Sequence, residues 1–187
     1  MFLALAKVLL IRHCRTNGSN HDSPLTDVGR EQAETLATWL DGRGVDRIVS
    51  SPYLRAVDTI VPFATRAGVE VETDGRLRER NFGGSFATPQ DRVDAVIAAL
   101  ADYDLRQEGG ETGRELVARA WPALVEAMAG PNALTVLIGH RQLNSHLLRE
   151  IEPSSGLEVW RSMTTPDVFE IWRDGGGVHY KLVWDGL

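Results

Sequence analysis

Short apolar runs alternate with longer stretches of helical periodicity along this chain. The run Lys7–Arg12 is almost wholly apolar between its two charged ends, which is typical of a central strand buried on both faces. Arg47–Ser50 and Leu134–Gly139 have the same character. Strands that alternate with helices form layered α/β domains, so the pattern predicts a mostly parallel sheet covered by helices. No linker or repeat interrupts it, and we therefore expect a single domain over residues 1–187.

Helices are predicted where apolar residues recur three and four positions apart. Thr26 is a candidate N-cap for a helix whose apolar positions run from Val28 to Leu40. The other expected helices are Arg55–Ala67, Asp91–Asp102, Arg114–Met128 and one through Leu143, Leu147 and Leu148. The other expected strands are Val69–Val71, Val168–Trp172 and Val178–Trp184, the last two as a hairpin. Gly75–Pro89 has no clean period, and long irregular segments of this kind are often functional.

Composition excludes several classes of function. The net charge of −6 is unfavourable for nucleic-acid binding, which needs a basic surface. Cys14 is the only cysteine, so neither an internal disulfide nor a cysteine-based zinc cluster can form, which suits a reducing cytoplasm. The apolar opening MFLALAKVLLI carries Lys7 and is too short to span a membrane, so we expect it to form the buried first strand.

Chemically competent side chains follow the ends of two predicted strands. His13 comes directly after the first strand together with Arg12, and His140 follows Leu134–Gly139. Open α/β sheets place their ligands at the carboxyl ends of strands. An unprotonated imidazole is a nucleophile at neutral pH, and arginines such as Arg12 and Arg55 match the oxygens of a phosphoryl group. A carboxylic acid such as Glu79 can protonate the leaving oxygen. Such a set needs no metal.

The order of the motifs resembles the histidine phosphatase superfamily, also called the phosphoglycerate-mutase-like family. The stretches that carry the resemblance are VLLIRHCRT, SPLTDVGREQA, SSPYLRAVDTI, LRERNFGG, EGGET and VLIGH, with VFEIW as a late match. The resemblance implies a three-layer α/β/α sandwich and catalysis without a cofactor. It implies that His13 is the phosphorylated nucleophile, that Arg12, Arg55 and His140 hold the phosphoryl group, and that Glu79 is the general acid.

Further substrate-binding residues are carried over from the same motifs. Thr16 matches the pocket threonine of the first motif, and Thr112 stands where the family often has a serine. A phosphate-binding asparagine of the loop after the first strand corresponds by spacing to Ser19, with Asn20 next to it, and the choice between them stays open. Arg80 and Arg141, together with Arg78, are expected at the mouth of the site and suggest a second anionic group on a small phosphorylated substrate.

Two glycines of the family pattern are replaced in this chain. Cys14 follows the nucleophile, and Arg141 follows the second histidine. Cys14 also suggests a cysteine phosphatase, in which an arginine six positions later cradles the phosphate. That position is Asn20 here, so a cysteine nucleophile would lack the cation that lowers its pKa.

Three functions remain as alternatives. A phosphatase passes the phosphoryl group to water, whereas a mutase returns it to a sugar acid. The family's mutases carry a tyrosine where this chain has Phe82, and they are longer, which favours the phosphatase. A non-catalytic phosphate-binding module is the third possibility. The sequence does not decide the oligomeric state, and a dimer is one option.

Overall fold

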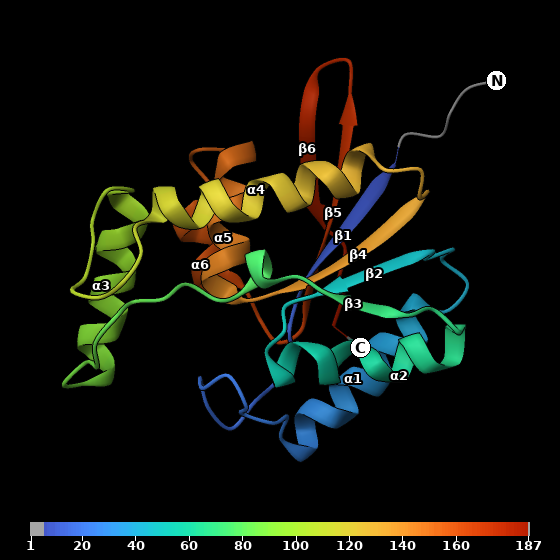
Figure 1. The fold of residues 1–187 in the computed structure, drawn as a ribbon, viewed down its shortest axis with the longest axis horizontal. Coiled ribbons are helices and arrows are strands. Elements are labelled where there is room, and N and C mark those ends of the chain that lie inside the picture. The colour runs from blue at the N-terminus through green and yellow to red at the C-terminus, as the bar shows by residue number, and fades with distance from the viewer. Residues whose placement is uncertain (1–5, 187) are drawn as a thin grey trace.

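A computed structural model describes residues 6–186 of the chain (Figure 1). Its strands are β1 (Lys7–Arg12), β2 (Arg47–Ser50), β3 (Val71–Thr73), β4 (Leu134–Gly139), β5 (Asp167–Asp174) and β6 (Gly177–Leu182). Its helices are α1 (Asp27–Leu40), α2 (Leu54–Ala67), α3 (Pro89–Ala101), α4 (Gly113–Ala129), α5 (Arg141–Ile151) and α6 (Gly156–Ser162), with a 3₁₀ turn, η1, at Gly75–Leu77. No helix within the described range is long and apolar enough to cross a membrane.

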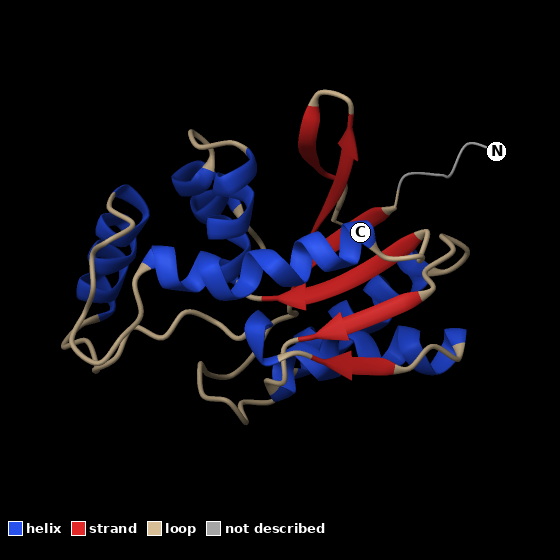
Figure 2. Cartoon of the chain, turned by 45° about the horizontal axis from the view of Figure 1, so that its top comes forward, coloured by secondary structure: helices blue, strands red, loops and turns tan. Residues whose placement is uncertain are grey.

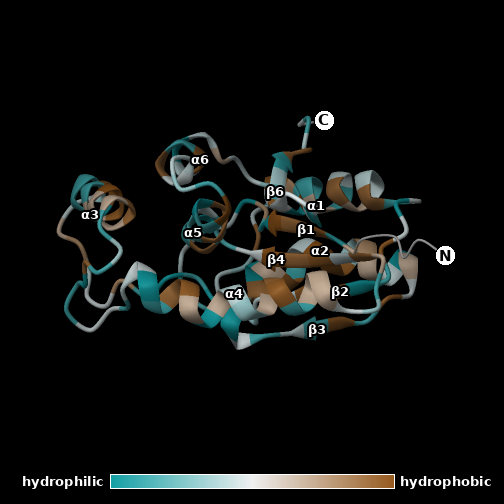
Figure 3. Ribbon diagram, turned by 90° about the horizontal axis from the view of Figure 1, so that it is seen from above, coloured by the Kyte–Doolittle hydropathy of each residue, from teal (hydrophilic) through white to brown (hydrophobic). Residues whose placement is uncertain are grey.

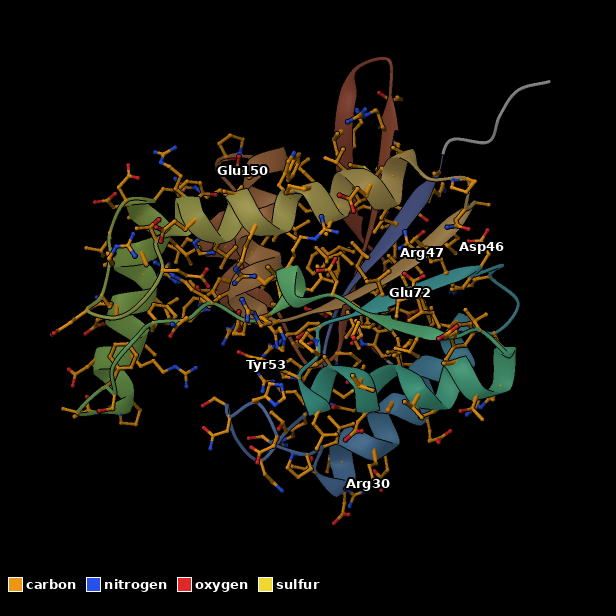
Figure 4. All side chains as sticks on the ribbon, in the orientation of Figure 1. Arg30, Asp46, Arg47, Tyr53, Glu72 and Glu150 are labelled. Atoms are coloured by element: carbon orange, nitrogen blue, oxygen red, sulfur yellow. The ribbon has the colours of Figure 1, made fainter. Side chains whose placement is uncertain are left out.

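The six strands form one sheet in the order β3-β2-β4-β1-β5-β6. β3, β2, β4 and β1 run parallel, and β5 and β6 add an antiparallel edge. Arg12 pairs in register with Gly139, so the residues after β1 and β4 emerge side by side. Figure 2 shows the parallel strands pointing towards the side on which α3 stands. At the other edge, Arg47 and Glu72 join β2 to β3 through two hydrogen bonds of 2.9 and 2.8 Å (Figure 4).

Alternate residues of β1 enter two different cores. Val8 and Leu10 pack with α4 and α5, whereas Leu9 and Ile11 pack with α1 and α2. In Figure 1, α4 lies above the strands and α1 and α2 lie below them. Colouring by hydropathy shows β1 and β4 as apolar ribbons inside these layers (Figure 3). The predicted three-layer α/β/α sandwich with a mostly parallel sheet is therefore confirmed.

Some details differ from the sequence-based expectations; for example, β6 ends at Leu182 rather than at Trp184. β3 begins at Val71 rather than Val69, because α2 ends at Gly68 in the left-handed region, with φ of 67°, and the chain then turns before it pairs with β2. α6 was not expected at all, since it is short and depends on the packing of Trp160 against α3. Residues 1–5 of the expected first strand lie outside the described residues.

Candidate active site

A cleft of about 1490 Å³ opens at the carboxyl ends of β1 and β4. Its floor includes Arg12, His13, Arg55 and Glu79. The irregular segment 78–88 and one face of α3 form the opposite side. α3 stands apart from the layers around the sheet in Figures 1 and 2. The fold thus gathers residues from three separate sequence motifs at one place.

His13 is held as a neutral imidazole with one defined tautomer. Its Nδ1 lies 2.7 Å from the carbonyl oxygen of Cys14, to which the Nδ1–H donates. Burial lowers the pKa of His13 to about 3, and the charges of Arg55 and Arg12 act in the same direction against that backbone hydrogen bond. Arg55 Nε donates to His13 Nε2 at 3.3 Å. Nε2 therefore carries the lone pair, and a phosphoryl group on it would lie within reach of a guanidinium.

The two arginines are fixed from behind by backbone carbonyls. Arg12 donates to the carbonyl oxygens of Met163 and Thr164 at 2.8 and 2.9 Å. Arg55 donates to those of Asn20 and Ser19 at 2.8 and 3.4 Å. Burial lowers the pKa of Arg12 to about 10, with Arg141 adding to the shift and Glu79 opposing it. Both guanidiniums thus stay charged at neutral pH and keep their positions with little rotational freedom.

His140 is completely buried beside the nucleophile. Its ring centre lies 5.2 Å from that of His13, in an edge-to-face arrangement. Nε2 lies 2.8 Å from the hydroxyl oxygen of Ser51. Burial lowers the pKa of His140 well below its ordinary value, and neighbouring positive charges add to the shift. His140 is therefore a second neutral imidazole in contact with the first.

Glu79 is positioned by the start of a helix to which it does not belong. Its carboxylate accepts hydrogen bonds from the backbone N–H of Leu143 at 3.0 Å and of Gln142 at 3.2 Å. These are free donors of the first turn of α5, whose N-cap residue, His140, makes no side-chain cap. The Arg80 N–H adds a third bond at 2.9 Å. Capping of α5 thus fixes the carboxylate next to His140.

The loop after β1 contributes its backbone more than its side chains. The Thr16 hydroxyl donates to the Pro24 carbonyl at 2.8 Å and so closes the loop, although Thr16 also lines the cleft. Ser19 and Asn20 line the cleft as well, and both use their carbonyl oxygens to hold Arg55. All three predicted residues are at the site, and the contacts seen here are with the protein itself.

Arg80 and Thr112 are engaged in structural contacts. The Arg80 guanidinium is buried and donates to the carbonyls of Glu111 and Leu105 and to Nε2 of His146. Thr112 is the N-cap of α4, where its hydroxyl accepts from the N–H of Glu115. These bonds occupy the groups that were predicted to meet substrate. They attach the Glu79 segment to α5 and set the start of α4.

Arg141 occupies the rim of the cleft. Its guanidinium donates to the carbonyl of Trp160 at 2.7 Å and stacks over the Trp160 ring at 4.3 Å. It thus faces the cleft in place of the family glycine while being bound to α6. Arg141 therefore lies at the mouth of the cleft, as predicted, and one face of its guanidinium is covered by the Trp160 ring.

Four residues at the site were not predicted from the sequence. Tyr53 contacts both His140, at 5.1 Å between ring centres, and Arg55, at 4.8 Å, and it lies beside the loop after β1 (Figure 4). The others are Ser51, which holds His140, and Phe86 and Arg92, which line the far side of the cleft. Tyr53 and Ser51 stand in the SSPYLRA motif, so that motif contained the signal.

Cys14 points away from the chemistry. Its side chain is fully buried and packs with Leu25 and Ala33, and its backbone N–H donates to Thr59 at 2.9 Å. Burial raises the pKa of the thiol to about 12, so the thiolate is scarce at neutral pH. No described non-glycine residue, Cys14 included, has a positive φ, which explains why the family glycine can be replaced here.

We therefore expect the substitution Cys14→Ser to keep most of the phosphatase activity, with kcat within about threefold of the parent. The unfolding free energy should fall by about 1–3 kcal/mol, because a hydroxyl would be buried between Leu25 and Ala33. Steady-state kinetics and urea unfolding measure the two effects. Cys14→Ala is the matched control without a hydroxyl. A loss of kcat of a hundredfold or more in both folded variants would restore the thiol as a candidate nucleophile.

Comparison with known proteins places the chain among the histidine phosphatases. The model of the histidine phosphatase superfamily, branch 1, matches residues 8–183. A glucosyl-3-phosphoglycerate phosphatase of Mycobacterium tuberculosis is 33% identical over 155 residues, which cover 72% of this chain and 70% of that protein. A Yersinia pestis protein named "Probable phosphoglycerate mutase GpmB" is 36% identical over 151 residues, with 72% and 70% covered.

Solved structures give the same result. A mycobacterial glucosyl-3-phosphoglycerate phosphatase in complex with inorganic phosphate superposes with a TM-score of 0.79 at 26% identity, and 97% of each chain is covered. The comparisons confirm the predicted family and the predicted enzyme class, a phosphatase. The chain belongs to the histidine phosphatase superfamily, branch 1.

Proposed function

We propose that this chain hydrolyses small phosphate monoesters through a phosphohistidine on His13, with Arg12, Arg55, Glu79 and His140 completing the active site. The geometry of His13 supports this proposal most directly. A neutral imidazole with its Nδ1–H bound to a carbonyl leaves Nε2 free to attack, and a guanidinium nitrogen lies 3.3 Å from that atom. Relatives named as phosphatases of small phosphorylated molecules support the same assignment.

In the first step His13 Nε2 attacks phosphorus, and an N–P bond forms as the bond to the ester oxygen breaks. Glu79 gives its proton to the leaving oxygen. The guanidiniums of Arg12 and Arg55 balance the charge on the three non-bridging oxygens. The carbonyl of Cys14 stabilises the positive charge that develops on the imidazole, since it already accepts the Nδ1–H.

In the second step water attacks the phosphohistidine. Glu79, now a carboxylate, accepts a proton from that water while the N–P bond breaks and Nε2 recovers its lone pair. Inorganic phosphate then leaves, and the protonated Glu79 is ready for the next ester. No group outside the protein, its substrate and water is consumed in this sequence.

The mutase alternative differs only in the acceptor of the phosphoryl group. Incubation with 3-phosphoglycerate separates the options, because a phosphatase releases inorganic phosphate and a mutase forms 2-phosphoglycerate. We expect phosphate release here and also from para-nitrophenyl phosphate. Turnover of neither compound, nor of a panel of sugar phosphates and nucleotides, would leave only a phosphate-binding module and overturn the proposal.

We also propose a second anionic group on the substrate, which the arginines of the cleft support. Among its arginines, Arg80 and Arg141 are bonded to carbonyl oxygens of the protein. Arg78 and Arg92 line the same cleft, and their guanidiniums make no hydrogen bond or ion pair within residues 6–186. Burial lowers the pKa of Arg55, and the charge of Arg92 adds to this shift, against Glu79 and Tyr53. A carboxylate or second phosphate would neutralise this excess.

We therefore expect 3-phosphoglycerate to be a better substrate than glycerol 3-phosphate, which has a CH2OH group in place of the carboxylate. The ratio of their kcat/KM values should be about tenfold and should approach one in Arg92→Gln, since one charged hydrogen bond is lost. Arg173→Gln is the matched control, as Arg173 is exposed near the end of β5 that does not line the cleft. An unchanged ratio in Arg92→Gln would contradict the second anion-binding group.

The partner, the compartment and the oligomeric state of the protein are further proposals. We infer a small phosphorylated molecule rather than a nucleic acid as the partner, because the net charge of −6 is unfavourable for binding a polyanion, whereas the cleft gathers several arginines. A cytoplasmic location is favoured by the single, buried Cys14. A dimer is one option for the oligomeric state.

A further inference from the structure

The hydrogen bonds of His140 raise a question about its proton. A neutral imidazole has one N–H donor and one acceptor nitrogen. Nε2 of His140 lies 2.8 Å from Ser51 Oγ, whereas the buried Nδ1 has no hydrogen-bond partner within residues 6–186. The two tautomers therefore leave different groups without a partner. Counting these groups distinguishes them.

If the proton were on Nε2, that nitrogen would donate to Ser51 Oγ. The Ser51 hydroxyl also receives the backbone N–H of Tyr53 at 3.3 Å, so its own proton would have to go elsewhere. Within the described residues, His140 is its only available acceptor. The buried Ser51 proton and the Nδ1 lone pair would then both be unsatisfied, which is costly inside a protein.

If the proton is on Nδ1, every polar side-chain atom of Ser51 and His140 has a hydrogen-bond partner among the described residues except one. Ser51 accepts from Tyr53 and donates to His140 Nε2, so both of these groups are satisfied. The remaining group is the Nδ1–H donor of a ring that contacts His13. A buried, unused donor on a ring whose centre lies 5.2 Å from that of His13 is suited to an oxygen of the phosphoryl group that His13 accepts. Its desolvation cost is offset when that oxygen arrives.

We propose that Ser51 is a positioning residue that fixes His140 in the Nδ1–H tautomer, so that His140 donates a hydrogen bond to the transferred phosphoryl group. This inference rests on the phosphatase function proposed above, and it adds Ser51 to the proposed active site. Ser51 itself touches neither substrate nor the reacting atoms. Tyr53 supports the arrangement, because its N–H occupies one lone pair of Ser51 while its ring packs against His140.

The tautomer can be observed directly by ¹⁵N NMR of protein labelled at its histidines, with His140→Gln used to assign the signals. We expect Nδ1 of His140 to be protonated and Nε2 to be unprotonated in the parent protein at pH 7. Ser51→Ala should shift the equilibrium towards the Nε2–H form, whereas Ser51→Thr should keep the parent tautomer because it keeps the hydroxyl. A protonated Nε2 in the parent, or an unchanged tautomer in folded Ser51→Ala, would overturn the proposal.

Steady-state kinetics of the Ser51 variants provide a second test of the proposal. Ser51→Ala should lower kcat for para-nitrophenyl phosphate by about tenfold with little change in KM, and Ser51→Thr should recover most of the loss. Ser50→Ala is the matched control, since the buried Ser50 hydroxyl bonds only to a backbone carbonyl. An unchanged kcat in Ser51→Ala would reject the positioning role. Because the NMR result does not require turnover, an inactive parent protein with the expected tautomer would refute the proposed function and leave the Ser51–His140 tautomer assignment standing.

Discussion

Replacement of His13 by alanine should lower kcat by at least about a thousandfold, because the nucleophile that accepts the phosphoryl group is lost. The fold should survive, since the side chain lies at the edge of a cleft and the β1 core of Leu10 and Ile11 is untouched. Turnover of para-nitrophenyl phosphate measures the loss, and a thermal melt verifies folding. His179→Ala is the matched control, as His179 is partly exposed on β6, does not line the cleft and pairs with Asp174.

The same substitution should also remove a covalent intermediate. Brief reaction of the parent with ³²P-labelled substrate, followed by quenching in base, should give labelled protein that loses its label in acid, as a phosphoramidate does. Folded His13→Ala should carry no label. An acid-stable label, or label retained in His13→Ala, would place the phosphoryl group on another residue. Because the pKa of His13 is lowered to about 3, protonation of this nucleophile should not limit the rate above about pH 4.

The strands that position these residues could be read from the sequence. Lys7–Arg12, Arg47–Ser50 and Leu134–Gly139 were all predicted with the bounds that the structure has. Central strands of a parallel sheet are buried on both faces, so an apolar run between polar ends marks them clearly. β3 lies at the edge, where one side lacks a neighbour, and its start was misplaced by two residues. Burial, rather than intrinsic strand propensity, made the difference.

At the site, the sequence indicated which residues meet but not what their polar atoms bind. The partners of Arg80 are Leu105, Glu111 and His146, all at least 25 residues away, so no local pattern reveals that this guanidinium is already occupied. Gly83 and Gly110 allow the two irregular segments to pass closely, since a Cβ on Gly83 would lie 1.9 Å from the Glu108 carbonyl oxygen. Such close crossings depend on the assembled fold.

Thr112 is a different case. The sequence Thr112-Gly-Arg-Glu115 is a capping-box pattern, and the structure contains both of its reciprocal hydrogen bonds. The residue was predicted to bind substrate because of its place in the EGGET motif, while its local spacing already indicated a helix start. The capping role of Thr112 could therefore be predicted from the local sequence alone, and its role in substrate binding stays a prediction, as do the roles of His13 and Arg55.

Acidification should destabilise the fold well before its carboxylates are protonated. Burial is the largest cause that lowers the pKa of three histidines: His13 to about 3, His146 to about 4, and His140 well below its ordinary value. The neighbouring guanidiniums of Arg12, Arg55, Arg80, Arg119 and Arg149 act in the same direction, and Glu111 opposes them at His146. In the unfolded chain each imidazole has a pKa of about 6.5.

The direction in which the unfolding free energy changes with pH follows from proton uptake. Between about pH 6.5 and pH 4 the unfolded chain binds more protons than the folded one, so the unfolding free energy falls as the pH falls. From pH 7 to pH 5 the loss should be about 2 kcal/mol for each buried histidine. Urea unfolding at pH 7, 6 and 5 measures it. His13→Ala should reduce this pH dependence by about one third, and His179→Ala, which leaves the three buried imidazoles in place, is the matched control. A flat profile between pH 7 and pH 5 would mean that these imidazoles take up protons in the folded protein, and a protonated His13 could not act as the nucleophile.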